Sequence, residues 1–166
     1  MGVRIGTERT LTESFADAGY VTGGFHSNPL LTELFNFDRG FDHFDADQPV
    51  FADGVAGPGL WLTRVRRYLR KYAYLPAEQL TDKATGWVDG RSQDAPFFLW
   101  THFMDPHGPY QSRGGFEYYE KLRAERLWRK AVNSPDALSD AEQHRLEETY
   151  REEVRYTDAQ VGRLVE

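Results

Sequence analysis

The sequence contains no cysteine and no long apolar run. Without thiols, disulfide bonds and thiolate zinc sites are excluded. No segment is apolar over the roughly 20 residues that a membrane-spanning helix needs. Residues 1–11 carry charge and lack the apolar core of a signal peptide. We therefore expect a soluble chain, cytoplasmic as written, with no signal peptide or transmembrane segment; the compartment of a full-length protein is not indicated.

The chain also has little positive charge relative to its negative charge. Its net charge is -6 and its pI is about 5.4, which argues against a nucleic acid or an anionic membrane as a partner. Basic residues are dense only at 64–71. On a helix they spread over much of the circumference, so this cluster indicates a solvated helix face rather than a phosphate-binding patch.

What the chain does contain suits one globular α/β domain. Its 166 residues are 40% hydrophobic and 14% aromatic, unlike those of a disordered chain. Helical periodicity, capping residues and breakers predict helices with polar loops between them. The predicted helices cover residues 10–18, 30–35, 60–74, 77–88, 116–132 and 139–166, and a loop is predicted over 47–59.

Two segments resemble buried parallel strands, residues 20–25 and 95–103. The second has the longer apolar run and is expected to be the more buried strand. A sheet of two parallel strands is not stable alone, since its edges and faces need partners. The last predicted helix also runs to Glu166 without a stop signal. Together, these two features predict that the chain is part of a larger domain.

The apolar strand at 95–103 is followed by a stiff polar loop. Pro106 and Pro109 bracket His107 and stop any helix there. Loops at the carboxyl ends of parallel strands often carry functional groups. His107 is therefore a candidate proton donor or anion ligand, and a surface loop with an incidental histidine is the alternative.

Two apparent metal clusters are interpreted as structural. Residues 37–45 contain three aspartates and a histidine, but their alternation favours aromatic packing over ligation. His102, Asp105 and His107 have a spacing that can converge on a turn, but no fourth ligand is evident. His102 is interpreted as a satisfied core histidine, and no metal ligand is assigned.

Three segments, in this order and spacing, resemble the sulfatase family of the alkaline-phosphatase superfamily. The first has T-L-T-E at 10–13, G-Y-V-T at 19–22 and G-F-D at 40–42. The second has P-F-F-L at 96–99 and D-P-H-G-P-Y at 105–110. The third, at 150–164, reads Y-R-E-E-V-R-Y-T-D-A-Q-V-G-R-L. The resemblance implies an α/β fold, a partial alkaline-phosphatase-like domain with few parallel strands flanked by several long helices.

The resemblance also implies an activity, the hydrolysis of sulfate esters. The family uses a formylglycine nucleophile made from cysteine or serine, beside calcium or a similar divalent cation. His107 matches the family histidine of the P-H-x-P loop, which contacts the ester, so it is the candidate catalytic residue. The expected partner of a complete domain is a small-molecule or glycan sulfate ester.

The departures from the family pattern limit what this chain is expected to do. The nucleophile motifs C-x-P-x-R and S-x-P-x-R and the paired metal-binding aspartates are absent. Where many members have K-W-H, residues 27–29 read S-N-P, and His26, Asn28 and Asp105 are further candidates for substrate contact. We expect residues 1–166 to be the central portion of one catalytic domain, inactive and binding no cofactor alone, with the missing parts of that domain as a possible partner.

Two other functions remain open on the sequence. The S-N-P replacement is compatible with a phosphodiester or phosphonate hydrolase of the same superfamily. The predicted amphipathic helices and the acidic composition are compatible with a non-catalytic helical interaction module. A P-H-x-P loop at a strand end has no role in such a module.

Overall fold

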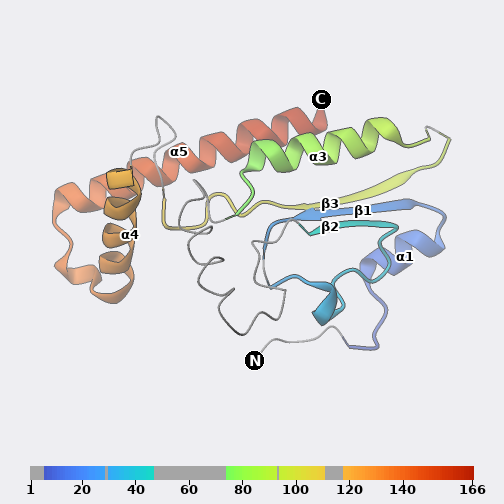
Figure 1. Cartoon of the computed structure of the whole chain (residues 1–166), viewed down its shortest axis with the longest axis horizontal. Coiled ribbons are helices and arrows are strands. Elements are labelled where there is room, and N and C mark those ends of the chain that lie inside the picture. The colour runs from blue at the N-terminus through green and yellow to red at the C-terminus, as the bar shows by residue number, and fades with distance from the viewer. Residues whose placement is uncertain (1–5, 29, 47–73, 93, 111–117) are drawn as a thin grey trace, which may run out of the picture. The chain divides into compact units, whose positions relative to one another are not determined.

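The computed structural model describes residues 6–28, 30–46, 74–92, 94–110 and 118–166 (Figure 1). The chain forms two compact units, residues 1–104 and 105–166. The first unit is an α/β layer structure and the second is built from two long helices. The predicted α/β class is therefore confirmed. The predicted loop at 47–59 and nearly all of the predicted helix at 60–74 lie outside the described residues.

The first unit contains a three-stranded parallel sheet of order β2-β1-β3. Its strands are β1 (Val21–His26), β2 (His43–Ala46) and β3 (Phe97–His102). The prediction of two strands was wrong, because β2 was interpreted as a turn-rich segment. The expectation that the strand at 95–103 is the more buried was also wrong, since β1 lies between the other two and is buried along nearly its whole length.

Two glycines of β1 allow aromatic rings to pack closely against the backbone of this strand on both faces of the sheet. A β-carbon on Gly23 would lie 2.8 Å from the indole of Trp87, and one on Gly24 would lie 2.9 Å from the ring of Phe44. Aromatic rings therefore rest directly on the strand backbone. An apolar run predicts a buried strand well, but here the most buried strand is the one with the small residues.

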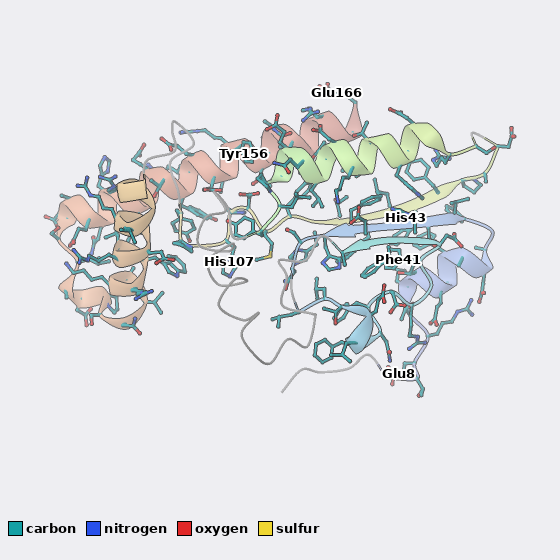
Figure 2. The ribbon with its side chains drawn as sticks, in the orientation of Figure 1. Glu8, Phe41, His43, His107, Tyr156 and Glu166 are labelled. Carbon is teal, nitrogen blue, oxygen red and sulfur yellow. The ribbon has the colours of Figure 1, made fainter. Side chains whose placement is uncertain are left out.

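Helices α1 (Leu11–Asp17) and α3 (Ala77–Gly90) pack on opposite faces of the sheet (Figure 1). On the α1 face, the ring of Phe15 stacks on that of Phe98 at 4.4 Å. On the α3 face, Trp87 meets the ring of Phe25 edge to face. Phe41 and His43 flank the start of β2 and contact opposite faces, Phe41 through Phe98 and His43 through Trp87 (Figure 2).

A polar contact joins α1 to the loop before β2. Thr10 and Glu13 form a capping box at the start of α1. The Arg39 guanidinium donates to both carboxylate oxygens of Glu13, at 2.8 and 2.9 Å. The hydrogen bonds from the Thr10 backbone and from Arg39 lower the pKa of Glu13 below its usual value. The next residue, Gly40, has φ +83° and presses against the first turn of α1.

The predicted helix at 30–35 is only a 3-10 turn, Glu33–Phe35. Leu30 and Leu34 are 68% and 70% exposed, so this segment has no buried apolar stripe to hold a longer helix. Asn36 then adopts a left-handed conformation with φ 63°, which ends the turn.

The second unit consists of the His107 loop and helices α4 (Tyr118–Asn133) and α5 (Asp140–Val165). A short turn, Pro135–Ala137, connects the helices. Ser139 and Glu142 form a capping box at the start of α5, and the Glu142 carboxylate also accepts from Lys130 of α4 at 2.6 Å. This ion pair ties the two helices together at their connected ends.

Candidate functional site

The carboxyl edge of the sheet carries two histidines at matching positions. β1 ends at His26 and β3 ends at His102, and the two are register partners in adjacent parallel strands. Register partners in a parallel pair point to the same face of a sheet. The imidazoles of His26 and His102 therefore lie on one face, at the edge where open α/β sheets bind ligands.

His26 is fully buried, and among the residues that the structure describes neither of its ring nitrogens has a hydrogen-bond partner of acceptable geometry. The rings of Phe44 and Trp100 lie 5.0 and 5.9 Å from it. Burial and the neighbouring His102 lower the pKa of His26 to about 4, while the Asn28 carbonyl and Asp45 act in the opposite direction. The ring is therefore neutral at pH 7, with one donor and one acceptor directed into its surroundings.

His102 is not the satisfied core histidine that the sequence suggested. Its Nδ1 is buried and has no hydrogen-bond partner within the described part of the chain. Buried polar atoms are nearly always paired in folded proteins, so unpaired nitrogens on two neighbouring strand ends mark this edge as unusual. The sequence does carry a signal for this pair, because both strands end in histidine, but the signal requires the strand register.

The polypeptide after β1 turns sharply at Ser27 and Asn28. The Ser27 hydroxyl is buried and donates to the Leu75 carbonyl at 3.4 Å. Asn28 Oδ1 accepts the backbone N–H of Leu30 at 2.9 Å, which forms an Asx turn. The Asn28 side-chain oxygen therefore stabilises the turn, and the side-chain NH2 group is the part of the amide that can donate hydrogen bonds.

The His107 loop belongs to the second unit. His107 is exposed, and its Nδ1 lies 2.6 Å from the carbonyl oxygen of Gly108 (Figure 2). Nδ1–H is the donor in this contact, so in the neutral ring Nε2 is the acceptor. Asp105 is only 2% exposed, which makes it part of the loop's interior rather than of its surface.

Aromatic packing holds this loop on α4 and α5. A β-carbon on Gly108 would lie 2.6 Å from the indole of Trp128. The ring of Tyr110 lies 5.0 Å from Trp128 and 5.2 Å from Tyr150, and its burial beside Tyr150 and Glu153 raises the pKa of Tyr110. The candidate residues thus fall into two groups, His26 and Asn28 in the first unit and Asp105 and His107 in the second.

The described donors at the strand edge do not suit calcium. Calcium takes six to eight oxygen ligands, whereas His26 and His102 offer imidazole nitrogens. The nearby Asp45 carboxylate binds Lys83 at 3.0 Å. Within the described ranges, no three His, Asp or Glu side chains are grouped so as to hold a metal ion. We therefore assign no step to a metal bound by these residues.

The family model described as Sulfatase matches residues 2–166. The chain belongs to the sulfatase family. Neither the curated proteins nor the solved structures contain a match to this sulfatase-family chain. Among its described helices, none has the length and apolar character needed to cross a bilayer.

Proposed function

We propose that this chain is part of a hydrolase that cleaves sulfuric esters. The observation that carries the proposal is the family match over residues 2–166, together with histidines at the carboxyl edge of the sheet and on the following loop. Sulfatase family membership supports hydrolase chemistry on sulfate esters.

His107 is the proposed catalytic residue. Its ring is exposed on a loop that aromatic packing holds in place, and the Nδ1 contact with Gly108 fixes the tautomer. With the proton on Nδ1, neutral His107 accepts at Nε2; when doubly protonated it donates from Nε2 to a sulfate oxygen or to the departing alcohol oxygen. The ring then stabilises charge that develops on the leaving group.

Three other residues are proposed to contact or position the substrate. Asn28 has the NH2 group of an amide that the Asx turn orients, and this group can donate to the substrate. Neutral His26 is fully buried, which supports a positioning role for its ring. His26 is the last residue of β1 and Asn28 lies two residues beyond it, so both are at the carboxyl end of this strand. Asp105 is buried in the His107 loop, which supports a positioning role for this carboxylate rather than direct contact.

We further propose that the 166 residues do not turn over a sulfate ester alone. The printed sequence has no cysteine and no S-x-P-x-R motif, so it has no formylglycine precursor of the family pattern. The chain would then represent the central portion of a catalytic domain. The missing portions of that domain would supply the nucleophile and the divalent cation, calcium or a similar ion.

The five histidines provide the test, because each gives its own ring signal in a heteronuclear NMR spectrum. Titration with 4-nitrophenyl sulfate should shift the His107 signal in a saturable way and leave His43, which stacks on Trp87, unchanged. No response of His107 at millimolar ester would contradict its role. In a parallel assay with calcium, turnover that His107→Ala abolishes would contradict inactivity of the isolated chain.

A phosphate ester is the second candidate substrate, because residues 27–29 read S-N-P and offer no cation to a sulfate. The same titration with bis(4-nitrophenyl) phosphate, a phosphodiester, separates the two. A tighter response of His107 to the phosphate ester than to the sulfate ester would favour the phosphodiester or phosphonate hydrolase. A response to neither ester would favour the helical interaction module.

A further inference from the structure

Helix α5 buries a carboxylate while it leaves valines exposed. Glu153 is only 2% exposed, whereas Val154 and Val161 are each 39% exposed. The hydrophobic effect alone would turn the valines inward and the carboxylate toward water. Glutamate is almost never fully buried, because water solvates its charge strongly. The burial of Glu153 therefore needs a reason other than apolar packing, and the proposed hydrolysis does not yet use this group.

Glu153 lies beside the Tyr110 side chain of the His107 loop. Residues three apart on a helix are neighbours on its surface, so Glu153 is next to Tyr150. The Tyr150 ring lies 5.2 Å from the ring of Tyr110. Burial, Tyr150 and the negative charge of Glu153, in that order, raise the pKa of Tyr110. The carboxylate therefore acts directly on the Tyr110 hydroxyl and favours its protonated form.

Tyr110 in turn joins the His107 loop to α4. Its ring meets the indole of Trp128 edge to face at 5.0 Å. Gly108 approaches the same indole so closely that a β-carbon would lie 2.6 Å from it. Pro109, between these two contacts, restricts the backbone. A movement of the Tyr110 ring is therefore transmitted to His107 through a short, stiff segment.

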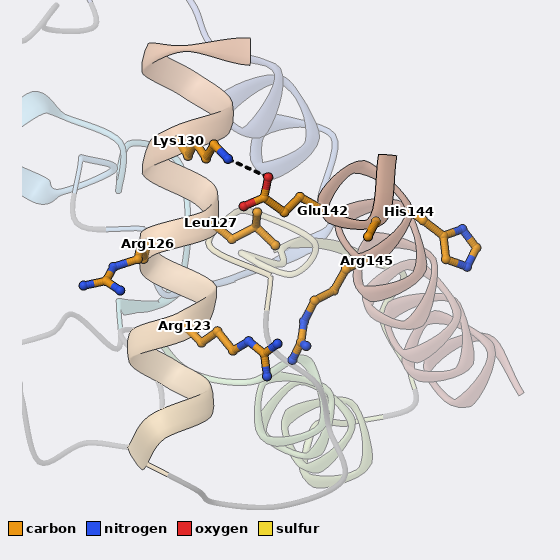
Figure 3. A pocket seen from close by; sticks show the side chains of 8 residues that line it. Arg123, Arg126, Leu127, Lys130, Glu142, His144 and Arg145 are labelled. Atoms are coloured by element: carbon orange, nitrogen blue, oxygen red, sulfur yellow. Dashed lines mark hydrogen bonds and ion pairs between the residues drawn. The ribbon is translucent and has the colours of Figure 1, made fainter. Parts of the chain in front are cut away.

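The two helices that carry Trp128 and Glu153 are tied to one another. At their connected ends, the Lys130 ammonium and the Glu142 carboxylate form an ion pair at 2.6 Å (Figure 3). The capping box of Ser139 and Glu142 fixes the start of α5 at the same place. Glu153 follows about three turns further along the same unbroken helix. The helix therefore sets the position of this carboxylate relative to α4.

We propose that Glu153 is a positioning residue for His107 and that it acts through Tyr110. The buried carboxylate holds the Tyr110 hydroxyl as a donor, the Tyr110 ring stays against Trp128, and the loop keeps the His107 imidazole in one orientation. A carboxylate suits this task better than a neutral amide, because a charged acceptor binds a hydroxyl donor more strongly. The proposal rests on the proposed function only for the statement that His107 contacts the ester.

The test uses the 166-residue chain and follows the ring signals of His107 and Tyr110 by NMR. Glu153→Gln removes the charge and keeps the size of the side chain. It should lower the pKa of Tyr110 and shift the His107 signal before any ester is added. It should also raise the Kd of 4-nitrophenyl sulfate about fivefold, the effect of one lost hydrogen bond. Glu152→Gln is the matched control, since Glu152 is the adjacent, exposed carboxylate of α5, and it should change the Kd less than twofold.

Tyr110→Phe tests the path, because it removes only the hydroxyl on which Glu153 acts. It should shift the His107 signal as Glu153→Gln does, and the two changes together should have no larger effect than either alone. Additive effects would mean that Glu153 acts by another route and would overturn the proposal. If Glu153→Gln does not fold, Tyr110→Phe decides, and an unchanged His107 signal in that variant overturns the proposal.

The signals of the free chain keep this proposal separate from the proposed function. If His107 of the parent chain does not respond to 4-nitrophenyl sulfate, the proposed function fails, and the ester-free shifts of His107 and Tyr110 still decide the role of Glu153. If His107 binds the ester with the same Kd and the same free signal in Glu153→Gln as in the parent chain, the role of Glu153 is overturned and the proposed function stands.

Discussion

His26 and His102 occupy register-matched positions at the carboxyl ends of two adjacent parallel strands, and each has a buried ring nitrogen for which the described residues provide no hydrogen-bond partner. An unsatisfied buried polar group costs about 1–3 kcal/mol. The two histidines therefore lower the stability of the fold at the edge of the sheet where a ligand is expected. Its retention in the fold is consistent with a role at that edge.

The first prediction concerns pH, because His26 has a pKa of about 4 in the folded chain against 6.5 for an ordinary histidine. The unfolded chain then binds more protons between pH 6.5 and 4, so the free energy of unfolding falls as the pH is lowered through this range. The difference between the two pKa values corresponds to about 3 kcal/mol. Urea unfolding at pH 7.5, 6 and 5 should show about 2 kcal/mol of this loss, because the remainder falls between pH 5 and 4.

His26→Gln removes the titrating ring, so the variant should lose less stability than the parent chain between pH 6.5 and 4. Carboxylates that titrate in this pH range change the free energy of unfolding of both proteins equally, so their contribution cancels in the comparison. A direct measurement covers the case in which the variant does not fold. By NMR, a His26 ring signal that titrates near pH 6.5 in the parent chain would contradict the prediction.

Local sequence patterns predicted most of the described elements. The strands at 20–25 and 95–103 and the helices at 10–18, 77–88, 116–132 and 139–166 lie within a few residues of the observed bounds. The short strand β2 was missed although its segment alternates polar and apolar residues, which is a strand period. Its aspartates and glycine resemble a turn, and only pairing with β1 makes residues 43–46 a strand.

Contacts between segments far apart in the sequence account for the features of the fold that local patterns did not predict. No local pattern indicates that Trp87 and Phe44 pack on Gly23 and Gly24, which is what makes β1 the central, buried strand. At the site, the stiff loop around His107 is visible in the sequence because prolines act locally. The pairing of His26 with His102 is not, because it depends on strand register over 76 residues of separation, from position 26 to position 102.

The second prediction concerns the close approach of Gly108 to Trp128. Gly108→Ala places a methyl group about 2.6 Å from the indole, so the loop or the indole ring must shift. Forced overpacking of this kind costs about 1–3 kcal/mol. We expect a shift of the His107 ring signal and a weaker response to 4-nitrophenyl sulfate, both measured by NMR.

Trp128→Leu added to Gly108→Ala makes room for the methyl group and should restore part of the response. Gly162→Ala is the control, because a β-carbon there meets nothing within 4 Å in α5. It should stabilise the helix by about 0.5–1 kcal/mol. A His107 signal that is the same in Gly108→Ala and in the parent chain would show that the loop does not depend on Trp128.

The third prediction concerns the polar tie between the start of α1 and Arg39. Arg39→Lys keeps the charge but removes the planar fork that contacts both oxygens of Glu13. The capping box of Thr10 and Glu13 should remain, so we expect a modest loss of stability, about 0.5–1.5 kcal/mol, in urea unfolding at pH 7. Arg39→Ala should lose more. Equal stability of the parent and both variants would mean that the contact contributes nothing.

The fourth prediction concerns Gly40, which combines a positive φ of +83° with a close contact. A β-carbon there would lie 2.5 Å from the backbone nitrogen of Glu13, and backbone cannot move aside as a flexible side chain does. Gly40→Ala should therefore destabilise the first unit by more than the roughly 1 kcal/mol that a left-handed alanine costs. Gly19→Ala isolates that cost, because Gly19 has φ +85° and open space around its β-carbon position. Thermal or urea unfolding should rank the parent above Gly19→Ala and Gly19→Ala above Gly40→Ala. If the two variants are equally stable, α1 does not press on Gly40.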